Sequence, residues 1–226
     1  MYWLMRTLAP SRGATARLVV ALSVATAILA CARLAGQNSG PERDAWQHPE
    51  QVMDALGVKP GYAVADVGCG RGYFTFKLAS RVGSGGKVYA EDLQDDEIAE
   101  IRRQAKEKGL TQIEAITGTP DDPHLPAGVL DVVLIVDAFH EMHQYDAMLV
   151  AIYRALKPGG LLALIDGKAE PGKPREDYYS RHRMPEEMER QDAERNGFHF
   201  LREEPGFTRP EPHKDYYFLI FEKPKP

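Results

Sequence analysis

Cysteine is scarce in this sequence, whose 226 residues include only Cys31 and Cys69. Cys31 ends an apolar stretch and Cys69 lies among glycines, so the sequence predicts no disulfide framework. Internal repeats are also absent. The longest apolar stretch, about 15 residues near the N-terminus, is short for a membrane span. These absences favour a globular domain that holds together through an apolar core.

Basic residues are outnumbered, because 28 Lys and Arg face 33 Asp and Glu and leave a net charge of -5. The first 31 residues carry three arginines and no acid, so the remainder has a net charge of -8. Binding to phosphate backbones requires clustered Lys and Arg. No large insertion capable of cradling a duplex interrupts the chain. The composition therefore excludes nucleic acid as an expected partner.

The first 36 residues have the order of a secretory signal peptide or N-terminal anchor. Arg6, Arg12 and Arg17 precede the apolar residues 18–32, which end in small side chains around Cys31. Residues 37–45 are a predicted linker. If the leader functions, the domain is exported, either to the periplasm or as a membrane-anchored protein, with membrane association through this segment. Otherwise the protein is cytoplasmic.

Strand and helix patterns alternate along residues 46–226, which predicts an α/β domain with a parallel, doubly wound sheet. Two final strands without an intervening helix predict an antiparallel edge hairpin. The expected strands are residues 63–67, 87–92, 112–117, 131–137, 161–166, 199–203 and 216–222. The expected helices are residues 46–56, 73–82, 95–108, 144–156 and 184–196.

The first expected strand is followed by three glycines, Gly68, Gly70 and Gly72. The first of them comes two residues after Asp66. Glycine permits a tight turn and close approach of the main chain to a ligand. A dinucleotide fingerprint requires G-x-G-x-x-G, and here Tyr73 occupies the position of its third glycine. The spacing therefore disfavours a nicotinamide oxidoreductase.

This glycine segment resembles motif I of the class I S-adenosylmethionine-dependent methyltransferases. The acid that ends residues 87–92 and the Leu-Lys-Pro-Gly-Gly of residues 156–160 also fall where that family has them. The resemblance implies a Rossmann-like, seven-stranded, mostly parallel sheet over residues 46–226. It also implies S-adenosylmethionine as the cofactor.

The resemblance assigns roles to several side chains. Gly68, Gly70 and Gly72 would cradle the amino-acid part of the cofactor, while Asp66 would brace the loop or reach its ammonium group through water. Asp92 would accept hydrogen bonds from the ribose hydroxyls, with its neighbour Glu91 as the alternative. Two further acids, Asp121 and Asp122, are candidates for contact with the adenine amino group.

The fourth strand leads into residues 137–143, where acceptor contacts are expected. His140 or Glu141 is positioned to take a proton from an acceptor, and Asp137 to contact the cofactor or the loop. Alternatively, His140 only closes the pocket by hydrogen bonding. His140 and His143 are spaced as two metal ligands on a helix, but the segment is no full H-E-x-x-H motif and no further Cys or His lies nearby in sequence. A metal site is therefore not predicted.

Taken together, the expected function is methyl transfer from S-adenosylmethionine to a small-molecule acceptor. The alternative is a non-catalytic protein that binds the same nucleoside on the same fold.

Overall fold

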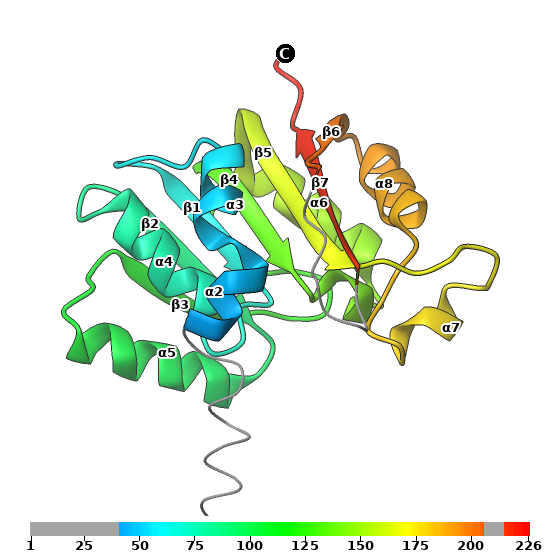
Figure 1. The fold of residues 1–226 in the computed structure, drawn as a ribbon. Helices are drawn as coiled ribbons and strands as arrows, with labels where there is room; N and C mark the ends of the chain where they lie inside the picture. Colours follow the sequence, from blue (N-terminus) through cyan, green and yellow to red (C-terminus); the bar gives the residue numbers. More distant parts are fainter. Residues whose placement is uncertain (1–40, 206–214) are drawn as a thin grey trace, which may run out of the picture. The chain divides into compact units, whose positions relative to one another are not determined.

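The computed structural model describes residues 41–205 and 215–226 (Figure 1). The expected signal segment of residues 1–36 therefore lies outside the described residues, as do residues 37–40 of the predicted linker, whereas its residues 41–45 lie in the helix Pro41–Gln47. The chain divides into two units after Ala45, and the whole sheet belongs to Trp46–Pro226. Among the described residues, no helix has both the length and the apolar character needed to cross a membrane.

Seven strands form one sheet in the order β3-β2-β1-β4-β5-β7-β6. The first five are parallel to one another, and β7 runs antiparallel to both of its neighbours. The predicted α/β architecture with an antiparallel edge hairpin is therefore confirmed. The strands are β1 (Ala63–Val67), β2 (Lys87–Asp92), β3 (Ile113–Thr117), β4 (Leu130–Val136), β5 (Leu156–Gly167), β6 (His199–Glu203) and β7 (Tyr216–Glu222).

Helices cover both faces of the sheet (Figure 1). On α4, Phe74, Leu78 and Val82 recur at helical spacing and form the buried stripe that packs on one face. On the other face, α6 buries Leu149 and Ile152. The helices are α2 (Pro41–Gln47), α3 (Pro49–Ala55), α4 (Tyr73–Val82), α5 (Asp95–Glu107), α6 (Tyr145–Ala155), α7 (Glu176–Tyr179) and α8 (Glu186–Arg195), with the 3-10 turn η1 (Phe139–Glu141).

The single helix expected over residues 46–56 is wrong, because the segment is split between α2 and α3. His48 lies between them at φ 45. Pro49 begins α3, and a proline disfavours the helical conformation in the residue before it. Trp46 packs against the ring of Tyr216, with ring centroids 5.9 Å apart. It therefore contributes to the core.

Two other boundaries differ from the sequence-based prediction. β5 begins at Leu156, so residues 157–160, which lie between the expected helix 144–156 and the expected strand 161–166, are an irregularity within the strand. Pairing with β4 shifts register there, between Leu130 and Val132. Gly159 adopts φ 80 inside this irregularity. In addition, the segment between the expected strand 161–166 and the expected helix 184–196 contains the short helix α7.

Strand order reverses between β1 and β4, and ligands of open α/β sheets bind beside such a switch, at the carboxyl ends of the strands. The segments that follow β1 and β4 meet there. A Cβ built on Gly68 would lie 2.6 Å from the Cβ of Ala138. The glycine loop and the expected acceptor segment are thus parts of one site.

Candidate active site

The loop between β1 and α4 requires glycine for two different reasons. Gly68, Gly70 and Gly72 all have positive φ, at 69, 50 and 82°. A side chain on Gly68 would collide with Ala138, whereas a Cβ on Gly70 would meet nothing within 4 Å. Gly70 therefore borders open space, and its missing side chain leaves room for a ligand against the main chain.

Asp66 ties the end of β1 to the start of α4. Its carboxylate is buried, and Oδ2 accepts a hydrogen bond of 2.6 Å from the hydroxyl of Thr75. This contact spans the glycine loop, so it holds the two ends of the loop in fixed positions. The arrangement corresponds to the bracing role expected for Asp66.

Asp92 ends β2 beside the same loop. Its Oδ2 accepts the N–H of Gly70 at 2.9 Å, and its Oδ1 accepts the N–H of Gln94 at 3.0 Å. Each oxygen retains a second lone pair that can accept a hydrogen bond from a ligand. The two N–H groups thus orient the carboxylate at the position expected for the ribose contact.

Glu91 is almost completely buried, with 2% of its surface exposed, and its Oε1 has no hydrogen-bond partner. The side chain lies over Gly118, because a Cβ there would overlap that oxygen. Burial raises the pKa of Glu91 to about 8, an effect that the Gly68 N–H opposes and the charges of Asp92 and Asp66 reinforce. At neutral pH this carboxyl is therefore mostly protonated.

The site around the glycine loop is acidic, and this property selects among ligands. Asp66, Glu91 and Asp92 lie close enough to raise the pKa of the Cys69 thiol, after burial as the larger cause. Such a site favours a ligand that carries positive charge and repels a pyrophosphate. With the open space at Gly70 and the unpartnered Glu91 oxygen, these residues fit a cationic nucleoside such as S-adenosylmethionine.

The two acids that follow β3, Asp121 and Asp122, form polar contacts with residues outside the glycine loop. Asp121 accepts a hydrogen bond of 2.8 Å from the hydroxyl of Thr119. Asp122 accepts one from the N–H of His124 at 2.8 Å and pairs with Arg154 on α6 at 3.1 Å. Neither contact involves the glycine loop, so the adenine assignment of these acids stays a prediction.

A buried histidine–carboxylate pair lies where β4 and β5 end. His140 and Asp166 are 1% and 0% exposed, and Nδ1 of His140 lies 2.7 Å from Oδ1 of Asp166. A carboxylate only accepts hydrogen bonds, so the proton is on Nδ1 and Nε2 faces away from the core as a base. Asp137 precedes this pair at φ 55, and its N–H donates to the carbonyl of Ile165 at 2.8 Å.

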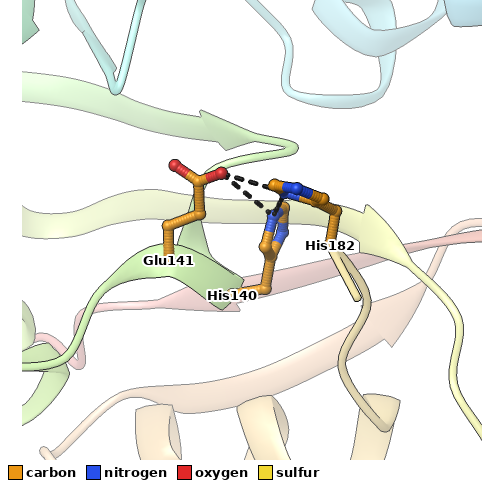
Figure 2. Close-up of side chains that lie close together, drawn as sticks. All are labelled: His140, Glu141 and His182. Carbon is orange, nitrogen blue, oxygen red and sulfur yellow. Dashed lines mark hydrogen bonds and ion pairs between the residues drawn. The ribbon is translucent and has the colours of Figure 1, made fainter. Parts of the chain in front are cut away.

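Figure 2 shows that His140, Glu141 and His182 point their polar atoms toward one another. Nε2 of His140 lies 3.2 Å from Nδ1 of His182 and 3.6 Å from Oε1 of Glu141. Nδ1 of His182 lies 3.0 Å from the same Glu141 oxygen. Burial lowers the pKa of His140, but the hydrogen bond and charge of Asp166 outweigh it, and the net pKa is raised.

Two residues that contact His140 were not predicted from the sequence as site residues. Asp166 and His182 lie 26 and 42 residues beyond His140 in the chain, so no local spacing connects them. A buried acid at the end of a parallel strand was the available signal for Asp166. His143, which the sequence paired with His140, instead packs against the ring of Tyr179 at 4.1 Å between centroids.

Comparison with known proteins finds similarity to methyltransferases. Residues 64–160 match a family model described as a methyltransferase domain. The chain is 33% identical over 114 residues to nocamycin O-methyltransferase of Saccharothrix syringae, covering 50% of this chain and 41% of that protein. It is 30% identical over 125 residues to demethylmenaquinone methyltransferase of Lactococcus lactis subsp. lactis (strain IL1403), covering 55% and 49%.

A solved structure described as a SAM dependent methyltransferase from Aquifex aeolicus resembles the fold with a TM-score of 0.68. It shares 27% identity, and the match covers 81% of this chain and 94% of that one. The chain spans about half the length of the curated relatives it matches.

Proposed function

We propose that this chain, whose family match and structural relative support membership of the class I S-adenosylmethionine-dependent methyltransferases, transfers a methyl group from S-adenosylmethionine to a small-molecule acceptor. The observation that carries the proposal is the pairing of an open main-chain surface at Gly70 with the oriented carboxylate of Asp92.

The cofactor would supply an electrophilic methyl group on a sulfonium. Its amino-acid part would lie against the glycine loop, and its ribose hydroxyls would donate to Asp92. Positioning is the main task of an enzyme with so reactive a methyl donor. The bracing of the loop by Asp66 and Thr75 serves that task, since it fixes the surface on which the donor lies.

The acceptor would meet His140 and Glu141 at the end of β4. A hydroxyl, thiol or ammonium acceptor must lose a proton during methylation. Nε2 of His140 would accept this proton, because Asp166 holds the ring in place through Nδ1. Both curated relatives carry names of methyltransferases that act on small organic molecules, nocamycin and demethylmenaquinone. The acidity of the chain agrees with a small-molecule acceptor.

Calorimetric titration of the full chain with S-adenosylmethionine, S-adenosylhomocysteine and NAD tests the cofactor assignment. We expect binding of the first two and none of the third, and no binding of either adenosyl compound would refute the proposal. Transfer of labelled methyl to a panel of small phenols, thiols and amines tests catalysis. Binding without transfer to any acceptor would support the non-catalytic alternative.

We also propose that residues 1–36 act as an export leader. Support comes from the sequence alone, in which arginines, an apolar run and small residues follow in the required order. Cell fractionation and sequencing of the mature N-terminus test this. An intact N-terminus in the cytoplasm would refute it.

A further inference from the structure

We propose that His140, Glu141 and His182 form a binding site for a divalent first-row transition metal ion such as Zn²⁺. The three side chains come from η1 and from the segment between α7 and α8 (Figure 2). Each offers one ligand atom to a common point, and the three atoms lie within 4.8 Å of one another.

The separations between the three atoms match the edges of a metal coordination shell. Bonds of about 2.0–2.2 Å from zinc to nitrogen and oxygen place neighbouring ligands about 2.8–3.6 Å apart across octahedral and tetrahedral geometries. The observed separations are 3.0, 3.2 and 3.6 Å. An ion between them would need only small movements of the exposed side chains of Glu141 and His182.

Hydrogen bonds alone satisfy this cluster incompletely. In its unprotonated form, with the remaining proton on Nδ1 and directed at Asp166, the His140 ring presents a bare lone pair at Nε2. The Glu141 carboxylate also only accepts. A single proton on Nδ1 of His182 must then be shared between two acceptors, Nε2 of His140 and Oε1 of Glu141. A cation can instead bind all three atoms at once.

Asp166 is the partner that a metal-ligating histidine requires. Its two oxygens already accept three hydrogen bonds. The donors are the ring N–H of His140, the backbone N–H of His140 at 3.1 Å and the backbone N–H of Gly167 at 2.6 Å. It therefore positions the imidazole and is not itself a ligand. A carboxylate behind a ligating imidazole fixes its tautomer and increases its basicity.

The donor set indicates the class of ion and its purpose. Two imidazole nitrogens with one carboxylate oxygen suit Zn²⁺ or a neighbouring transition ion better than Mg²⁺, which prefers oxygen. Three protein ligands leave positions for water or acceptor. Glu141 and His182 side chains are 58% and 61% exposed, so these positions are open to an incoming molecule.

In catalysis the ion would replace the imidazole as the group that activates the acceptor, because coordination lowers the pKa of a bound hydroxyl or thiol. This role rests on the proposed function, whereas metal binding itself does not. His182 adopts φ 50, a conformation that is unfavourable for a side chain and is retained at functional positions.

The test uses the full chain without a histidine tag, stripped with chelator and titrated with Zn²⁺ by calorimetry and with Co²⁺ by visible absorption. We expect one ion per chain, and His182→Asn and Glu141→Gln to weaken binding more than about tenfold, the effect of losing even an outer partner. His143→Asn is the matched control, because it removes a neighbouring exposed histidine outside the cluster, and it should bind as the parent does. Circular dichroism confirms that each variant is folded.

Equal zinc affinity in the parent and in His182→Asn would overturn the metal site, as would the absence of Co²⁺ bands in the parent. S-adenosylmethionine binding is measured on the same stripped protein. Zinc binding without cofactor binding would leave the metal site standing and refute the proposed function, and cofactor binding without zinc binding would do the reverse.

Discussion

Replacing Glu91 with glutamine should stabilise the folded chain increasingly as the pH rises from about 4.5 to 8. The pKa of Glu91 rises from an ordinary value of 4.5 to about 8 on folding, because the carboxyl is buried and its Oε1 has no hydrogen-bond partner. Folding thus favours the protonated form. The stability associated with this proton is fully present below pH 4.5, decreases progressively as the pH rises, and is lost once the pH has passed through 8.

The size of the effect follows from the shift in pKa. One pKa unit corresponds to about 1.4 kcal/mol, so a shift of 3.5 units amounts to about 5 kcal/mol above pH 8. Between pH 5.5 and 7.5 the stability difference between Glu91→Gln and the parent should grow by about 3 kcal/mol. Glutamine retains an oxygen that can accept the Gly68 N–H, so the substitution removes mainly the ionisation.

Urea unfolding of both proteins at pH 5.5, 6.5 and 7.5, without cofactor, measures this difference. Burial also raises the pKa of Glu189, but that contribution is common to both proteins and cancels in the comparison. Glu187→Gln, at an exposed position on α8, is the matched control and should show no pH-dependent gain. A stability difference that stays constant across the three pH values would refute the reasoning.

Four further substitutions or treatments test the site. Gly70→Val should cost the fold about 1–2 kcal/mol, because a side chain at φ 50 is strained, yet should abolish calorimetric binding of S-adenosylmethionine by filling the open space; retained affinity would remove the loop from the site. Asp92→Ala should weaken that binding by about 1–3 kcal/mol. Arg154→Ala, which breaks the exposed pair with Asp122, should change stability by less than about 1 kcal/mol and leave cofactor affinity unchanged. Since burial raises the pKa of Cys69, its thiol should react with a disulfide reagent only after unfolding, measured in a Cys31→Ser chain; rapid reaction in the folded state would contradict its burial.

The sequence predicted those parts of the fold that depend on local pattern. β1, α4 and β2 have the predicted limits, because each is an apolar or amphipathic run bounded by glycine or by an acid. The split at His48 and the early start of β5 were not predicted. The first depends on the conformation that Pro49 imposes, and the second on pairing with β4, which local periodicity does not contain.

The residues of the candidate site also divide into those that local sequence pattern could predict and those that depend on contacts between distant segments. The glycine loop and Asp92 are close in sequence to the strands that present them, so the glycine spacing and the family resemblance could predict them as site residues. His140, Glu141, Asp166 and His182 instead come from η1, the end of β5 and the segment after α7. The contacts that join these three elements link residues 26 to 42 positions apart. Only the parallel register of β4 and β5, which brings the two strand ends together, places Asp166 behind His140.

The charge of the site is consistent with a turnover cycle in which the ligand changes charge. A sulfonium donor is positively charged at sulfur, and its demethylated product is not. The carboxylates of Asp66 and Asp92 present negative potential on the side of the glycine loop where the donor would lie. Attraction between these carboxylates and the donor would weaken once the methyl group has left. An acidic binding site therefore favours release of the product and binding of a new donor molecule. A phosphate-binding loop with the same glycines would not have this effect.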